Sequence, residues 1–320
     1  MEKIVVAVTE GDDKIKALDS TIERCGFFND LKKSLQKSGK KKEEFKIVVK
    51  PNIMMGYNKK YPHVATDPEL VEHLIKKMRE NHYTNIAVVE SQNFFMAWFP
   101  KKTVKRVATA MGYTGDTYNI VDLTKEAEPY NYGGKLGEDF VGGTWRDADY
   151  RISFPKNKTH SMCLCTLSMK NIFGTLPVWN KREQYHKGVG WDHATIDVLR
   201  HFPPDFAFVD AFWSSDGTFG AYIESPKYTK TIMGGKNFVA VDWVGAQKMG
   251  LNPMDYSLMQ LAVDVFGIPE FEVDGSLKVY ENWVNSSVQL GKLVTFLDFT
   301  KIPTLIFYYR FKRLSDPELV

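Results

Sequence analysis

Cysteine is scarce in this chain of 320 residues, which contains only Cys25, Cys163 and Cys165. A small, odd number of cysteines argues against a disulfide framework and favours a reducing compartment, so we expect a cytoplasmic protein. Three thiols also cannot supply the four ligands that an iron–sulfur cluster normally takes. The cysteine content therefore argues against a disulfide-stapled domain and against a cluster-bearing electron carrier.

Long apolar runs are absent as well. The segment 293–309 is rich in apolar residues, but Asp298, Lys301 and Pro303 interrupt it before the ~20 residues that a membrane-spanning helix requires. Three basic residues follow directly, namely Arg310, Lys312 and Arg313. No membrane span is predicted. A peripheral membrane contact is one interpretation of this tail, and the simpler one is docking on the core or on a sister subunit of a homo-oligomer.

Neither sign of charge dominates. The chain has 42 basic and 39 acidic side chains, a net charge of +3, which is too balanced for a typical nucleic-acid-binding domain. Its 43% apolar and 25% charged residues are typical of a soluble globular protein. The phosphate-binding Walker loop, the dinucleotide-binding glycine fingerprint and the Gly-x-Ser-x-Gly elbow of α/β-hydrolases are all missing. No cofactor is predicted.

Apolar runs of strand length alternate with segments of helical period, which predicts an α/β fold with a mostly parallel sheet flanked by helices. The predicted strands lie at 4–8, 47–49, 85–89, 118–123, 150–154 and 206–209. Glycine-rich sequence at 124–145 predicts an irregular loop and hairpin insertion. We therefore divide the chain into a first α/β portion, 1–125, and a second α/β portion, 126–320, with one continuous domain as the alternative.

Polar side chains follow four of these strands. Ligands of open α/β sheets bind outside the carboxyl ends of the strands, so we expect the following residues to share one edge. They are Lys50 and Asn52 after the second strand, Glu90 and Ser91 after the third, Lys156, Lys158 and His160 after 150–154, and Asp210 after 206–209.

The segment 156–160 is the most informative of these. If it is extended, alternate side chains share a side, so Lys156, Lys158 and His160 project together. Two ammonium groups and an imidazole on one edge favour a small anionic ligand, whereas the alternative is a solvated basic loop.

Residues 164–173 predict a helix that ends at Gly174. Its Lys170 and Asn171 form a polar pair among apolar neighbours, and Lys170 either reaches solvent or points into a pocket. The N-terminal amides of this helix would be able to face an anion. A second helix is predicted to start at 66–69, where the Thr-Asp-Pro-Glu sequence is typical of a capped N-terminus.

No standard zinc spacing is present, and no metal site is predicted. If a metal were bound, the candidate ligands are His160, His186 and His193.

A set of short motifs occurs in a characteristic order. They include Val49-Lys50-Pro51-Asn52, Pro155-Lys156-Asn157-Lys158-Thr159-His160, Ser168-Met169-Lys170-Asn171-Ile172-Phe173-Gly174 and Val209-Asp210-Ala211. In these the chain resembles the domain-of-unknown-function 362 family over roughly 46–253. The resemblance implies a link to ferredoxin-type proteins, and because this chain lacks their cysteine motifs, a separate ferredoxin partner is the corresponding expectation. The order of His160 and Lys170 is also similar in outline to that of nickel-pincer lactate racemases.

The leading hypothesis is an enzyme that acts on a small anionic metabolite by lysine–histidine acid–base chemistry, of lyase or isomerase type. Four residues are candidates for catalysis: His160 as acid–base, Lys170 to orient substrate, and Glu90 or Asp210 as a second acid–base. Seven are candidates for substrate binding, namely Lys50, Asn52, Ser91, Lys156, Lys158, Asn171 and His186. The alternatives are a non-catalytic ligand-binding or redox-partner module, and a metal- or metallocofactor-dependent enzyme using His160, His186 and His193.

Overall fold

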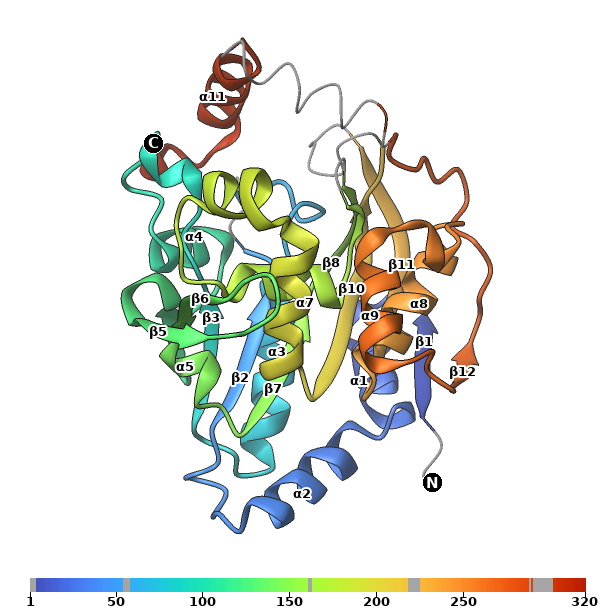
Figure 1. Cartoon of the computed structure of the whole chain (residues 1–320). Helices are drawn as coiled ribbons and strands as arrows, with labels where there is room; N and C mark the ends of the chain where they lie inside the picture. Colours follow the sequence, from blue (N-terminus) through green and yellow to red (C-terminus); the bar gives the residue numbers. More distant parts are fainter. Residues whose placement is uncertain (1–3, 54–57, 161–162, 218–224, 288, 290–301) are drawn as a thin grey trace.

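The computed structural model describes residues 4–53, 58–160, 163–217, 225–287, 289 and 302–320. A sheet of ten strands forms its centre, in the order β12-β1-β11-β10-β7-β2-β3-β4, with β8 beside β10 and β9 beside β8 (Figure 1). The strands are β1 (Val5–Glu10), β2 (Ile47–Pro51), β3 (Ile86–Glu90), β4 (Asn119–Asp122), β7 (Tyr150–Phe154), β8 (Lys156–His160), β9 (Leu164–Thr166), β10 (Phe206–Ser215), β11 (Pro226–Gly235) and β12 (Glu272–Gly275).

Most strand pairs are parallel, as predicted. Strands β10, β7, β2, β3 and β4 run in one direction, and β11 enters antiparallel between β1 and β10. Strands from 1–125 and from 126–320 lie side by side in this one sheet, since β7 pairs with β2 and β1 pairs with β11. The predicted glycine-rich insertion forms a separate hairpin of β5 (Ala127–Asn131) and β6 (Glu138–Gly142).

Helices cover both faces of the sheet (Figure 1). Alternate residues of each strand enter different cores: Val49 and Val88 face one layer, whereas Val48 and Val89 face the other. Because both faces are apolar, the strands read as continuous apolar runs in the sequence. One layer contains α1 (Lys14–Arg24), α2 (Phe27–Ser38), α3 (Pro68–Glu80) and α4 (Val104–Met111), and the other contains α6 (Ser168–Ile172), α7 (Trp191–His201), α8 (Phe238–Lys248) and α9 (Ser257–Phe266).

The helix predicted at 164–173 is wrong in its first half. Residues Leu164–Thr166 form β9, which pairs antiparallel with β8 and opposes Leu164 to His160. Pairing with β8 satisfies backbone groups of this segment, and so it outweighs the local helical pattern. The helix α6 begins only at Ser168. The helix predicted at 66–69 is confirmed, with the Asp67 side chain accepting a hydrogen bond from the Glu69 amide.

The C-terminal helix α11 (Ile302–Leu314) packs on the body through a small third cluster, in which Phe311 and Leu314 meet Val64 and Phe99. Within the predicted tail, 293–309, Tyr308 packs against Trp98 and Phe99, in line with docking on the core, whereas 293–301 lies outside the described residues. Among the helices described, none has the length and apolar character needed to cross a bilayer.

Candidate functional site

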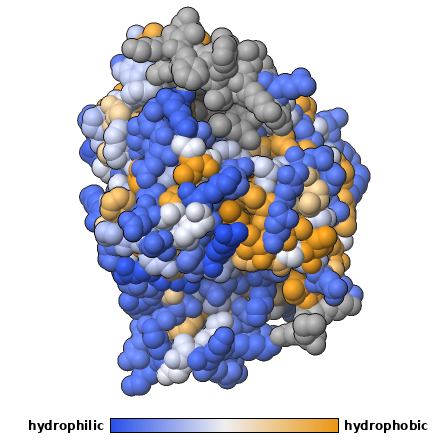
Figure 2. All heavy atoms as spheres, viewed as in Figure 1, coloured by the Kyte–Doolittle hydropathy of each residue, from blue (hydrophilic) through white to orange (hydrophobic). Residues whose placement is uncertain are grey.

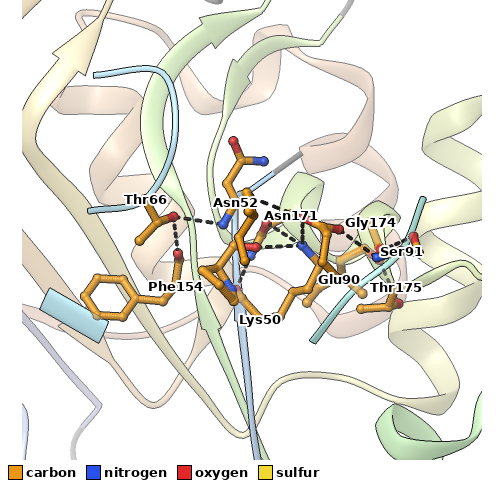
Figure 3. A network of polar contacts seen from close by, with 12 residues as sticks. Lys50, Asn52, Thr66, Glu90, Ser91, Phe154, Asn171, Gly174 and Thr175 are labelled. Atoms are coloured by element: carbon orange, nitrogen blue, oxygen red, sulfur yellow. Dashed lines mark hydrogen bonds and ion pairs between the residues drawn. The ribbon is translucent and has the colours of Figure 1, made fainter. Parts of the chain in front are cut away.

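The carboxyl ends of β2 and β3 meet at a buried ion pair (Figure 3). The ammonium of Lys50 lies 3.0 Å from Glu90 Oε2, and it also donates to the carbonyl of Pro51 at 2.7 Å. Asn171 on α6 closes the group, since its Nδ2 donates to the Lys50 carbonyl at 2.6 Å. Burial lowers the pKa of Lys50, and the Glu90 carboxylate opposes that shift. Sequence reasoning predicted these three residues, and the fold brings them together.

Gly174 lies against this pair. A Cβ at Gly174 would come within 2.9 Å of both Lys50 Nζ and Glu90 Oε1, so any larger residue here requires the ends of these two side chains to move. The Gly174 carbonyl accepts a hydrogen bond of 2.6 Å from Ser91 Oγ. Lys181 then donates to Ser91 Oγ at 2.7 Å and to the Gln92 carbonyl at 2.6 Å. Burial lowers the pKa of Lys181 to about 7.

A second buried ion pair lies between β8 and β10. Lys156 and Asp210 are opposed in the register of these strands, and their side chains meet at 2.5 Å with no exposed surface. Lys156 also donates to the Trp213 carbonyl, and Asp210 accepts from the Asp67 amide. Burial raises the pKa of the Asp210 carboxyl, although Lys156 opposes the shift. The charges of Lys156 and Asp210 therefore neutralise each other.

Lys158 lies between these two pairs and has no carboxylate partner among the described residues. Its ammonium donates to Asn52 Oδ1 and to the Val64 carbonyl, each at 2.9 Å. Burial lowers the pKa of Lys158 to about 7, and repulsion from Lys156 and Lys170 adds to the shift.

Lys170 is half-buried and has aromatic neighbours instead of acceptors. Its ammonium lies 4.0 Å from the centre of the Phe173 ring and 5.4 Å from that of Trp191. Within the described part of the chain, no acceptor or carboxylate bonds to it. Burial lowers its pKa. Lys170 therefore points toward the site rather than away from it.

Two half-buried histidines complete the outer part of the site. His186, on the helical turn η4 (Arg182–Val189), meets the edge of Phe173 with ring centres 5.5 Å apart. Its Nδ1 is buried and has no hydrogen-bond partner in the described structure. Burial lowers the pKa of His186 to about 3 and that of His160 well below its ordinary value, and the charge on Lys170 lowers both further. Both imidazoles are therefore neutral at neutral pH.

Contrary to expectation, the N-terminal amides of α6 are not available to bind an anion. The amides of Ser168 and Met169 donate to the two carboxyl oxygens of Asp242, at 2.7 and 2.8 Å. Asp242 lies on α8, and burial raises the pKa of its carboxyl to about 8. The protein's own side chain thus occupies the position that we expected for a ligand.

The three candidate metal-binding histidines do not form one group. In the part of the chain that the structure describes, no three His, Cys, Asp or Glu side chains are close enough to hold a metal ion. The ring of His193 instead lies 2.7 Å from the ammonium of Lys135.

A cleft of about 450 Å³ opens at the opposite edge of the sheet, near the starts of β2, β3 and β4. None of the predicted site residues lines it, so it is separate from the lysine-rich edge.

Sequence reasoning missed three contributors to the site: Gly174 as a close contact, Lys181 and Asp242. Lys181 lies in an irregular segment without periodicity, and Asp242 reaches α6 from a helix 74 positions away from Ser168. A close approach by Gly174 leaves no sign in the sequence beyond the glycine itself.

Comparison with known proteins gives three likenesses. The profile of a family described as a domain of unknown function (DUF362) matches residues 47–247. Thylakoid-associated protein sll1697 of Synechocystis sp. is 21% identical over 266 residues, covering 70% of this chain and 76% of the relative. The lactate racemase apoprotein from Thermoanaerobacterium thermosaccharolyticum is 11% identical with a TM-score of 0.39, over 66% of this chain.

These likenesses differ in what they support. The chain spans 51% of the racemase, and a TM-score of 0.39 carries no argument about shared chemistry. Because the relative from Synechocystis is named for thylakoids, a cytoplasmic location stays a prediction. The family profile covers well over half of the chain, so the chain belongs to the domain of unknown function 362 family.

Proposed function

We propose that this protein binds a small anionic metabolite at the lysine-rich edge and transfers a proton on it. The observation that supports the proposal is a group of three lysines without a counter-charge. Lys158, Lys170 and Lys181 have no carboxylate partner among the described residues, whereas Glu90 and Asp210 are each paired with another lysine and Asp242 is bound by the α6 amides. Unpaired ammonium groups in a low-dielectric site favour the entry of an anion.

The half-buried side chains define the side of this edge that a ligand would reach. Lys170, His160 and His186 lie on the accessible side, and Lys158 lies fully buried behind them. We assign anion binding to Lys170, whose ammonium has no competing acceptor in the described structure. Lys50 and Lys156 have a structural role in this proposal: their ion pairs connect β2 with β3 and β8 with β10.

His160 is the residue to which we assign proton transfer. A general base must be unprotonated before it acts, and the lowered pKa of His160 meets this condition at neutral pH. A bound anion offsets the positive charge of Lys170, which raises the basicity of the imidazole. His160 then accepts a proton from the carbon beside the anionic group, and the electron pair stays on that carbon. Delivery of a proton to the opposite face of that carbon, or to a neighbouring carbon, is an isomerase reaction, and loss of a leaving group is a lyase reaction.

Deuterium exchange tests this proposal whichever product the reaction forms. The protein is incubated in D2O with small 2-hydroxy and 2-amino carboxylates, and ¹H NMR follows loss of the signal at the carbon next to the carboxylate. We expect exchange in at least one compound, its abolition by His160→Gln, and an at least tenfold weaker apparent affinity for Lys170→Met. Lys187→Met, in an exposed pair with Glu183, is the matched control.

Two results would decide against this assignment. Exchange that persists in His160→Gln removes the role of the histidine. Thermal stabilisation by an anion without any exchange supports the alternative of a non-catalytic ligand-binding module.

A further inference from the structure

Among the described residues, the contacts of the helix α11 with the body lie on one face of the helix. Phe311 and Leu314 are buried in the cluster with Val64 and Phe99, and Tyr308 stacks on Phe99 with ring centres 5.3 Å apart. The Leu314 carbonyl accepts a hydrogen bond from Asn58. These contacts fix the helix on the protein and leave its opposite face outward, at the end of the molecule that bears the carboxyl ends of the parallel strands (Figure 1).

The outward face of α11 is apolar. Leu305, Ile306 and Tyr309 are 57%, 62% and 66% exposed, which is unusual for three large side chains on one helix. Tyr309 follows Ile306 by three residues and Leu305 by four, which places the three side chains on one side of the helix. Burial of this face by a partner would remove its apolar surface from water.

Two basic residues lie on the same outward face of α11. Arg313 follows Tyr309 by four residues, as Tyr309 follows Leu305, and Lys312 is exposed beside it. The helix contains no acidic residue. Neither Lys312 nor Arg313 forms an ion pair with another residue that the structure describes. Their long side chains can keep the charges at the level of lipid headgroups while the apolar residues insert.

A second apolar patch provides the contrast. Figure 2 shows apolar residues gathered over α9, where Phe266 and Ile268 are exposed. The exposed charges beside them are acidic, Asp264 and Glu270. Beside α11 the basic residues Lys312 and Arg313 lie on the exposed helix face and the acidic Asp316 and Glu318 follow the helix, so an anionic surface would favour the α11 face over the α9 patch, which has acidic neighbours.

We propose that the outward face of α11 docks the protein on an anionic lipid bilayer. The exposed apolar residues insert into the interface, where tyrosine is also favoured, and the cations bind the headgroups. The charge complementarity of Lys312 and Arg313 selects the lipid surface over an apolar protein partner. This inference does not depend on the proposed proton transfer.

Co-sedimentation of the full chain with vesicles tests the proposal, using phosphatidylcholine alone and a mixture of phosphatidylcholine with phosphatidylglycerol. We expect binding to the mixed vesicles, weaker binding to the neutral ones, and loss of binding in 0.5 M salt. The triple variant Leu305→Ser, Ile306→Ser, Tyr309→Ser should abolish binding, because it removes the apolar residues that insert.

Two further variants separate the contributions of charge and of apolar surface. Lys312→Ser with Arg313→Ser should weaken binding by about fivefold per cation. Phe266→Ser with Ile268→Ser, on the α9 patch, is the control and should bind like the wild type.

Three outcomes would overturn the proposal. The first is absence of binding to the mixed vesicles, and the second is equal binding of the α11 and α9 variants. The third is a wild-type dimer in light scattering that becomes a monomer when the three apolar residues are replaced, which would assign this face to a second copy of the chain. Circular dichroism checks that every variant is folded: the α11 variants should melt close to the wild type because their replaced side chains are mostly exposed, whereas Phe266→Ser also removes a ring contact with Phe238 and should melt at a lower temperature.

Discussion

The ammonium of Lys158 lies 2.9 Å from the carbonyl oxygen of Val64, and the side chain of Val64 packs in the same cluster as Phe311 of α11. One residue thus contacts both the lysine-rich edge and the docking site of the C-terminal helix. Val64 therefore connects the packing of α11 with the surroundings of the Lys158 ammonium.

Lys158 should make stability depend on pH. Its pKa is about 7 in the native protein and 10.5 in the unfolded chain, so between these values the unfolded state holds a proton that the native state lacks. The free energy of unfolding therefore rises with pH in this window, by about 1 kcal/mol per pH unit from this group. Urea unfolding of the wild type and Lys158→Met between pH 7.5 and 9.5 should show a difference that grows with pH. A constant difference would contradict the lowered pKa.

Asp242 should show the opposite slope. Its pKa is raised to about 8, so between pH 4 and pH 8 the native carboxyl holds a proton that the unfolded one has lost. The stabilisation linked to that proton is lost as the pH rises through 8. The free energy of unfolding of the wild type relative to Asp242→Asn should therefore fall from pH 4.5 to pH 7.5. If the difference in the free energy of unfolding does not change over this range, the two amide hydrogen bonds, rather than burial, determine the pKa of the Asp242 carboxyl.

Removing one partner of the buried ion pair between Lys156 and Asp210 should lower the free energy of unfolding. Lys156→Met leaves a carboxylate without a counter-charge in the interior, and we expect a loss of about 3–5 kcal/mol in the free energy of unfolding. Adding Asp210→Asn removes that charge and should recover part of the loss. Lys187→Met, which breaks an exposed pair, should leave stability nearly unchanged. If the double variant is no more stable than Lys156→Met, the charge is not the cause.

Gly174→Ala should disturb the pair of Lys50 and Glu90. The added methyl group would lie 2.9 Å from Lys50 Nζ, so we expect a loss of about 1–3 kcal/mol by overpacking. Gly11→Ala is the matched control, because a Cβ there meets no atom within 4 Å. Thermal unfolding monitored by circular dichroism compares the two. Equal melting temperatures for both variants would show that the site can rearrange around the methyl group.

The fold class was predictable because a parallel sheet buried on both faces produces apolar runs such as Ile47-Val48-Val49. The candidate edge was predictable for a related reason, since strands that run in one direction end on one side. Local sequence also marked the start of α3, where Asp67 and Pro68 meet the chemical needs of a helix N-terminus. Each of these features depends on residues that are neighbours in the chain.

The partners within the site depend on contacts between distant segments, which only folding creates. Residues 164–166 of the helix predicted at 164–173 instead form β9, because β8 provides backbone hydrogen-bond partners, and Asp242 binds the amides of α6 because α8 packs beside them. Of the five lysines at this edge, Lys50 and Lys156 pair with carboxylates, whereas Lys158, Lys170 and Lys181 have no carboxylate partner among the described residues. The sequence alone could place positive charge at this edge, but the pairing that leaves some of it uncompensated is set by strand register and burial.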